Sequence, residues 1–216
     1  PSDGGASRLV TTDVDSPAWS PDGSLIAFTR FNGQQSGIPG DLIGPEIWVV
    51  GPDGTGERTI GGRVGDGSRE RLSEFIGWAP DGSAISFERA FGRLLNSVEL
   101  GLVNLAGERN VLRRQHDVSV ELLIWAPDGS HLYYLEQAHF TSTLASVGSD
   151  GGNRGAIHIA DGVPGSLVMA PDGSTMAWGI QGSSDLVLQP VDGSVPTTYQ
   201  VAPNAVLAWQ PNLGKR

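Results

Sequence analysis

The sequence predicts an all-β fold in which a four-stranded antiparallel repeat recurs along a single domain of residues 1–216. The first observation is a short phrase, Trp-Ser-Pro-Asp-Gly at 19–23, which returns four times with one or more residues changed. The second is that short apolar runs flank each phrase, and the third is a further turn later in every repeat. The other copies of the phrase lie at 78–82, 125–129, 169–173 and 209–212. Spacing of this kind predicts repeated hairpins.

The phrase has the composition of a tight β-turn. Proline presets the φ angle, aspartate can accept a hydrogen bond from the nearby backbone, and glycine adopts a positive φ without steric cost. In the first repeat the apolar runs at 16–19 and 25–28 lie on either side of the phrase. The runs after the later phrases have the β-branched and aromatic bias of strands and lie at 85–87, 132–134 and 176–178. Each phrase therefore predicts a hairpin that joins a strand A to a strand B.

A second turn predicts two more strands in each repeat. In the first repeat the apolar run 47–50 leads to an Asp-Gly turn at 52–54 and then to a last strand at 58–60. The corresponding strands C are expected at 100–103, 144–147 and 186–188, and the strands D at 110–112, 157–159 and 199–201. The second repeat departs from the pattern, since it carries Ala106-Gly107 in place of Asp-Gly. Each repeat is thus predicted as strands A to D with tight turns at A/B and C/D.

A four-stranded repeat about every 40 residues is typical of the blades of a β-propeller. The phrase prolines lie at 21, 80, 127, 171 and 211, so the spacing shortens toward that length. Four complete blades are expected at 15–60, 74–113, 120–160 and 165–202. Residues 1–12 predict a lone strand D and residues 205–211 a lone strand A, so we expect a fragment of a larger propeller with missing blades. An incomplete fifth blade, or self-association between chains to close the ring, are the alternatives.

The pattern Trp-Ser-Pro-Asp-Gly-x-x-Ile-Ala-Phe at 19–28, with the later Asp-Gly turn, resembles the WD40-like PD40 repeat of TolB-type propellers. It is also similar to repeats in the propeller domains of prolyl oligopeptidase-type peptidases. The resemblance covers nearly the whole chain and departs from the repeat at Met169, at Ala106-Gly107 and at 211–213. The resemblance to TolB-type propellers implies a bacterial protein in a periplasmic or extracellular setting.

Composition excludes several classes of function. The formal net charge of −10 opposes binding of nucleic acid, because each phosphate contact would have to overcome long-range repulsion. The chain has no cysteine, which removes disulfides, thiol catalysis and thiolate metal sites. No apolar run approaches the roughly 18 to 20 residues of a membrane span, so we expect no membrane insertion. Residues 1–5 have no signal-peptide character.

The sequence contains no catalytic or metal-binding signature. It has no Gly-x-Ser-x-Gly phrase of a serine hydrolase, and its four histidines lack paired ligand spacing. The aspartates of the repeated phrase occupy the same place in each turn, which favours a backbone role over calcium binding. We therefore expect no catalytic site, no metal and no cofactor.

Strand alternation separates the connections into two faces. Strands A and C run opposite to strands B and D, so the A/B and C/D turns share one face and the B/C and D/A connections share the other. The added length falls on the second face, in the B/C loop 31–42 and the D/A connection 61–71 that follow strands of the first blade. Long loops on a rigid scaffold are where binding function concentrates, although tolerated insertions would have the same sequence pattern.

Binding residues are expected on this loop face. The candidates are Phe31, Asn32, Gln34, Asp41, Arg63, Asp66, Arg69 and Arg71, with Phe91, Arg93 and His139 from later loops. Exposed aromatic side chains beside basic ones suit contact with a protein or a glycan. We therefore expect a non-catalytic binding module that engages another protein or a cell-surface polymer. Two alternatives remain, a propeller that gates a prolyl oligopeptidase-type hydrolase domain absent from this chain, and a small propeller hydrolase.

Overall fold

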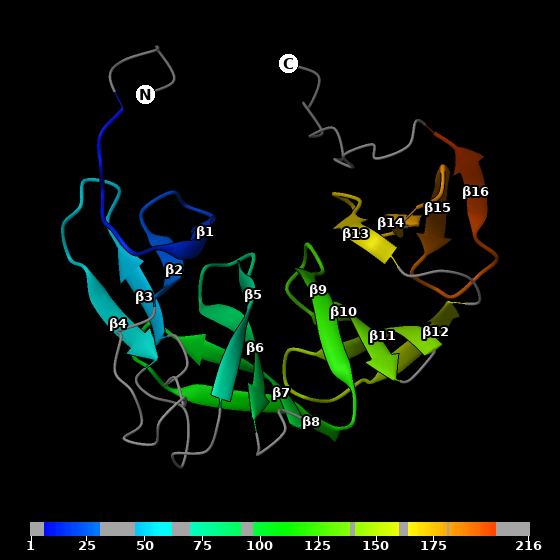
Figure 1. Ribbon diagram of the computed structural model, residues 1–216, viewed down its shortest axis with the longest axis horizontal. Coiled ribbons are helices and arrows are strands. Elements are labelled where there is room, and N and C mark those ends of the chain that lie inside the picture. The colour runs from blue at the N-terminus through cyan, green and yellow to red at the C-terminus, as the bar shows by residue number, and fades with distance from the viewer. Residues whose placement is uncertain are drawn as a thin grey trace. The chain divides into compact units, whose positions relative to one another are not determined.

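The computed structural model describes residues 7–30, 46–61, 70–91, 97–138, 141–159, 164–180 and 182–201. Within these ranges the chain forms sixteen strands and no helix. The strands make four antiparallel sheets of four strands each, and in every sheet the strands follow chain order (Figure 1). The all-β prediction and the four-stranded repeat are both confirmed.

Each sheet corresponds to one predicted blade. Blade one contains β1 (Asp15–Trp19), β2 (Ile26–Arg30), β3 (Glu46–Val50) and β4 (Arg58–Gly61), and blade two contains β5 (Glu70–Trp78), β6 (Ala84–Phe91), β7 (Ser97–Asn104) and β8 (Arg109–His116). Blade three contains β9 (Ser119–Trp125), β10 (His131–Ala138), β11 (Thr141–Gly148) and β12 (Gly155–Ile159), and blade four contains β13 (Pro164–Met169), β14 (Thr175–Ile180), β15 (Asp185–Pro190) and β16 (Thr197–Gln200).

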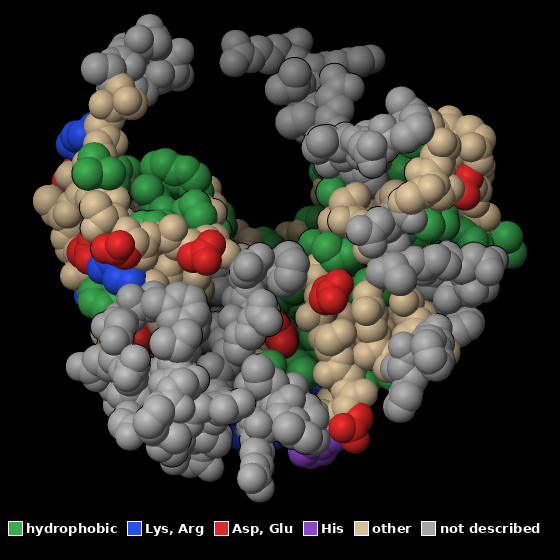
Figure 2. Space-filling model, in the orientation of Figure 1, with side chains coloured by type: hydrophobic (Ala, Val, Ile, Leu, Met, Phe, Trp, Pro, Cys, Tyr) green, Lys and Arg blue, Asp and Glu red, His purple; other side chains and the backbone are tan. Residues whose placement is uncertain are grey.

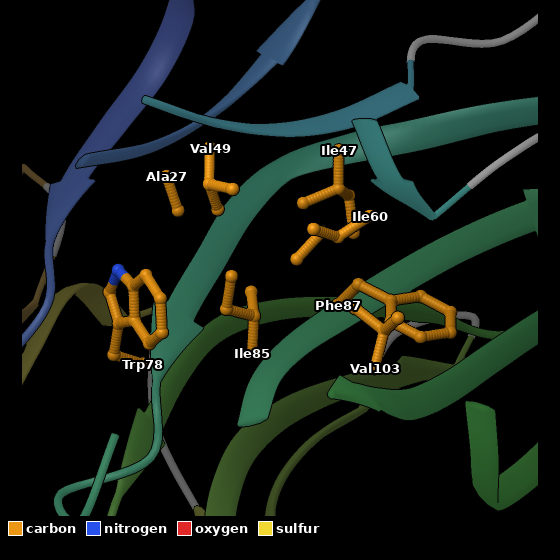
Figure 3. Close-up of a cluster of buried hydrophobic side chains, with 8 residues drawn as sticks. All are labelled: Ala27, Ile47, Val49, Ile60, Trp78, Ile85, Phe87 and Val103. Atoms are coloured by element: carbon orange, nitrogen blue, oxygen red, sulfur yellow. The ribbon is translucent and has the colours of Figure 1, made fainter. Parts of the chain in front are cut away.

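The chain divides into two compact units, Pro1–Val111 and Leu112–Arg216. The first unit contains blade one and blade two as far as the start of β8. Its core forms where alternate side chains of the two blades meet, because successive residues of a strand point to opposite faces. The eight core residues are Ala27, Ile47, Val49 and Ile60 from blade one and Trp78, Ile85, Phe87 and Val103 from blade two (Figure 3). All of them are buried.

The core of the second unit forms in the same way between blades three and four. It contains Leu135, Leu144, Leu167, Met176, Trp178 and Val187. Met169, which replaces the phrase tryptophan in blade four, is half-buried and packs against this cluster. An unbranched thioether side chain fills irregular core space, so this departure from the repeat keeps a packing role.

The A/B hairpins close through the predicted tight turn. In blade one the amide of Gly23 donates to the carbonyl oxygen of Ser20 at 2.9 Å, and the amide of Ser24 donates to Asp22 Oδ1 at 3.0 Å. Gly23 has a φ of 71°, which glycine adopts without the strain of a side chain. The same serine-to-aspartate bond recurs at Asp81, Asp128 and Asp172. The backbone role expected for these aspartates is confirmed.

In the C/D turn of blade two Ala106 stands at the aspartate position, and Asn104, two residues earlier, supplies the oxygen that accepts the turn hydrogen bonds. Its Oδ1 atom accepts hydrogen bonds from the amides of Ala106 at 3.0 Å and Glu108 at 2.9 Å. In blade one, Asp53 Oδ1 accepts from the amide of Thr55 at 2.9 Å. An amide oxygen and a carboxylate oxygen both accept hydrogen bonds, so the turn forms without the Asp-Gly pair that the sequence lacks there.

Residues 7–12, predicted as part of a lone strand D, belong to no sheet of the described chain. They nevertheless lie against the C/D turn of blade one, where a Cβ added to Gly54 would be 3.2 Å from the carbonyl oxygen of Val10. A Cβ added to Gly107 would likewise be 3.0 Å from the carbonyl oxygen of Ile60 in β4. Val10 therefore lies against the C/D turn of blade one in the same way that Ile60, in strand D of blade one, lies against the C/D turn of blade two. The predicted strand A at 205–211 lies outside the described residues.

The first strand of every blade is interrupted by a β-bulge or similar irregularity that the apolar pattern does not predict. The register of β1 shifts between Asp15 and Ala18, and β5, β9 and β13 contain comparable shifts. Ser16 and Leu122 have positive φ angles of 49° and 53° within two of these strands. A bulge increases local twist and bends the strand, so strand A differs in shape from the other strands of its blade.

Candidate functional site

Most of the predicted binding residues lie outside the described residues. These are Phe31, Asn32, Gln34, Asp41, Arg63, Asp66, Arg69, Arg93 and His139. Arg71 and Phe91 have a described backbone, and in the β5–β6 ladder Arg71 pairs with Ala90 and Phe91 pairs with Glu70. Both are therefore strand residues at the same end of blade two. The connection predicted at 61–71 is shorter than expected, because β5 already begins at Glu70.

The strand order supports the two-face arrangement of the connections. In blade one, β2 ends at Arg30 and β3 begins at Glu46, at the end of the sheet opposite the turn that contains Asp22. Because β4 is antiparallel to β3, β4 finishes with Gly61 at that same end of the sheet. The two connections that hold most of the predicted residues therefore leave blade one at the end opposite its Pro-Asp-Gly turn.

A groove lies at the Pro-Asp-Gly end of the first unit, between the A/B turns of blades one and two. Its volume is about 370 Å³. Its apolar lining comes from Pro21, Leu25, Trp78, Pro80 and Leu105, and its remaining lining from Ser20, Asp22, Ser24, Asp81 and Gly82. We call this feature the turn groove. The groove was not predicted from the sequence, because both turns were interpreted only as hairpin closures. The sequence feature that could have indicated it is the recurrence of proline followed by aspartate in the first two copies of the phrase.

Two contacts join the walls of the turn groove. The indole Nε1 of Trp78 donates to the carbonyl oxygen of Ala18 at 3.0 Å, which links β5 to β1. Pro21 Cδ lies 3.9 Å from the position that a Cβ would take on Gly82, so the two turns lie close together. The groove is therefore a built feature of the packed blades.

Both carboxylates of the turn groove are held in the ionised form. Hydrogen bonds from the Ser20 hydroxyl, and then from the amide and hydroxyl of Ser24, lower the pKa of Asp22 to about 2. The amide of Ser83 is the main cause that lowers the pKa of Asp81. Hydrogen bonds to a carboxylate stabilise its charged form, so the groove carries two negative charges at neutral pH.

Arg30 fastens the segment before β1 to blade one. Its Nη1 atom forms an ion pair with Glu57 Oε1 at 2.5 Å, and its Nη2 atom donates to Thr11 Oγ1 at 2.6 Å. The guanidinium carbon lies 5.0 Å from the ring centroid of Phe28 and 4.9 Å from that of Trp48. The hydrogen bond from Arg30 is the main cause that lowers the pKa of Glu57. These contacts give Arg30 a structural role.

Hydrophobic side chains are exposed over β1 and the segment that precedes it (Figure 2). Leu9, Val14 and Trp19 are among the exposed large apolar residues of the described chain. Trp19 occupies the first position of the repeated phrase, where Trp78 of blade two is buried. The same residue type at the same repeat position thus has two different environments.

Within the described ranges, no group of three or more histidine, cysteine, aspartate or glutamate side chains is arranged to hold a metal ion. No helix long and apolar enough to cross a membrane occurs in the part of the chain that the structure describes.

Comparison with known proteins gives structural matches without a sequence match. No family model and no curated protein sequence matches the chain. A candidate TolB from Agrobacterium tumefaciens superposes with a TM-score of 0.66 at 16% identity, over 91% of this chain and 64% of that one. TolB from Acinetobacter baumannii has a TM-score of 0.59 at 14% identity, over 81% of this chain and 41% of that one.

A structure of a nidogen/laminin complex also matches, with a TM-score of 0.60 at 15% identity, over 88% of this chain and 65% of that one. The chain therefore spans less than two thirds of the length of each of these three structures. Likeness at such low identity shows the fold. Together with the four four-stranded sheets, it establishes that this chain is a β-propeller of the kind seen in the TolB structures.

Proposed function

We propose that this chain is a non-catalytic, protein-binding propeller whose partner contacts the loop face of blade one. The observation that carries the proposal is the strand topology: the connections that follow Arg30 and Gly61 leave the same end of a sheet whose opposite end is closed by tight turns. A packed core beneath that sheet holds the strand ends in place. Segments anchored to a rigid scaffold in this way are suited to recognition.

The comparisons support a binding role. One matching structure is a nidogen/laminin complex, which is an assembly of proteins, and two are TolB proteins of bacteria. A periplasmic or extracellular setting is part of the same proposal, and a cell-surface polymer is the alternative ligand. The net charge of −10 favours a partner with a basic surface, because opposite charges raise the association rate.

The test is partner capture with a loop-shortened variant. The full chain is immobilised, exposed to a bacterial periplasmic extract, crosslinked, and the captured proteins are identified by mass spectrometry. A variant in which residues 31–42 are replaced by a short glycine-serine linker should lose the partner. Asp172→Asn, at a tight turn of blade four, is the control and should retain it. Equal capture by both variants would refute the assigned face, and sedimentation with isolated cell-wall polymer would identify the alternative ligand.

A further inference from the structure

We propose that the turn groove is a second recognition site, which binds an extended peptide segment carrying a basic side chain next to an aliphatic one. The groove lies at the end of blades one and two opposite the loop face, so it goes beyond the function proposed above. Its volume of about 370 Å³ is near the lower end of the range typical of ligand sites. A space of this size suits one or two side chains of an extended segment.

The apolar part of the groove suits an aliphatic side chain. Leu105 is 36% exposed at the groove, and Leu25 is half-buried beside it. Trp78 contributes its surface from β5, where its indole is already anchored to the carbonyl oxygen of Ala18. An aliphatic group placed there would remove apolar surface from water on both partners without moving the walls.

The charged part of the groove suits a basic side chain. Asp22 and Asp81 line it, and no lysine or arginine is among its lining residues. Both carboxylates stay ionised because hydrogen bonds within their own turns stabilise the charged form. A carboxylate has about four acceptor positions, so it can accept from a guanidinium while the turn bond remains. The net charge of −10 adds long-range attraction for a cationic segment.

The contrast with the second unit identifies the right control. Asp128 and Asp172 close the same kind of turn with the same serine amide bond, and hydrogen bonds lower the pKa of each. Neither of them lines the turn groove. Replacing aspartate by asparagine removes the charge and keeps an oxygen that accepts the turn bond, so the two pairs of substitutions differ mainly in location.

The probe is the peptide Gly-Leu-Arg-Leu-Gly-amide, labelled with fluorescein on its N-terminal amine and titrated with the full chain by fluorescence polarisation. The matched peptides carry glutamate in place of arginine, or alanine in place of both leucines. The original peptide should bind more tightly than either, and its affinity should fall between about 20 mM and about 200 mM salt, since exposed charges are screened. The double variant Asp22→Asn/Asp81→Asn should weaken binding about tenfold. The control Asp128→Asn/Asp172→Asn should leave it unchanged.

Several outcomes would overturn the proposal. One is equal weakening by the two double variants, which would show general charge attraction. Another is absence of binding by the original chain, and a third is a dimer in sedimentation that the groove variant dissolves, which would make a second copy the occupant. The variant Leu105→Ala tests the apolar part of the groove and should weaken peptide binding. Val195→Ala, at an exposed residue outside the groove, is its control and should leave binding unchanged. Thermal melting of each variant checks that it is folded.

The loop-face proposal and the groove proposal can be refuted independently of each other. The variant with residues 31–42 replaced should bind the peptide as the original chain does. The variant Asp22→Asn/Asp81→Asn should still capture the periplasmic partner. Loss of peptide binding in the loop variant would place the peptide on the loop face and refute the groove.

Discussion

Blades one and two carry the same phrase, yet their first tryptophans differ sharply. Trp19 is 59% exposed, whereas Trp78 is 9% exposed and lies in the core of the first unit. Trp78 is covered because blade one lies against it and because Ala18 accepts its indole hydrogen bond. The same phrase position is therefore a core residue in blade two and a surface residue in blade one, and its burial depends on what packs against it.

The largest expected effect is on Trp78. Replacing it by alanine should lower the free energy of unfolding by about 3–5 kcal/mol, because a large side chain leaves a cavity between two blades. Urea denaturation followed by circular dichroism measures this cost, with the slope of the transition as a check on two-state behaviour. A loss below about 1 kcal/mol would show that the two blades do not depend on this contact.

The buried ion pair of blade two should be the next most sensitive position. Arg89 and Glu99 lie 3.0 Å apart with side chains 8% and 2% exposed, while Arg30 and Glu57 of blade one form a pair that is 16% and 30% exposed. Glu99→Gln should cost about 3 kcal/mol, because it removes the negative charge that faces the buried guanidinium of Arg89. Glu57→Gln should cost about 1 kcal/mol or less, since water screens that pair. Equal urea midpoints for the two variants would contradict this difference.

The contact between a C/D turn and the preceding strand D can be tested at two glycines. Gly107 and Gly193 have φ angles of 87° and 79°, so alanine at either should cost about 1–2 kcal/mol from backbone strain. A Cβ on Gly107 would also meet the carbonyl oxygen of Ile60 at 3.0 Å, whereas a Cβ on Gly193 would meet nothing within 4 Å. Gly107→Ala should therefore be the more destabilising in thermal melts. The reverse order would mean that the turn does not rest on β4.

Trp19→Ala should change stability by only about 0.5 kcal/mol or less, as is usual at exposed positions. A cost similar to that of Trp78→Ala, or a cost that depends on protein concentration in denaturation experiments, would show that another surface covers Trp19 in solution.

The smallest effect is expected from acid titration of the turn aspartates. The pKa of Asp22 is lowered from 3.8 to about 2 by the Ser20 and Ser24 hydrogen bonds. A folded-state pKa below the unfolded value means that the stabilisation is present above about pH 4 and is lost as the pH falls toward 2. When the pH is lowered from about 5 to about 2, the melting temperature should fall less in Asp22→Asn than in the original chain. Parallel curves would refute the role of the carboxylate charge.

Local sequence chemistry predicted most of the fold. The Pro-Asp-Gly phrase closes its hairpins as expected because proline, aspartate and glycine each determine the geometry of a few consecutive bonds. The predicted strands of the four complete blades were confirmed, with β6 and β7 of blade two extending beyond the apolar runs, whereas residues 7–12 join no sheet and the strand predicted at 205–211 lies outside the described residues. The role of Asn104 was missed, although an asparagine three residues before a glycine was a readable turn signal. The bulges at Ser16 and Leu122 had no such signal.

The candidate sites were less accessible to sequence reasoning. The loop-face residues remain a prediction, apart from the backbone of Arg71 and Phe91, which the structure assigns to strands. The turn groove could not be predicted from either phrase alone, because Asp22 and Asp81 line one cavity only after β1 and β5 have packed together. Proximity between distant residues is a property of packing and is not encoded in any local pattern.

The sequence by itself determined the number of strands per blade, their order and the turns that join them, since these depend on bonds between residues close along the chain. Only the tertiary structure decided that Trp78 is buried and Trp19 exposed, that Arg89 meets Glu99 in the interior, and that two hairpin turns enclose a groove. The physical reason is that burial and electrostatic environment depend on the surfaces that surround a residue, and the same repeat presents the same residue to different surroundings.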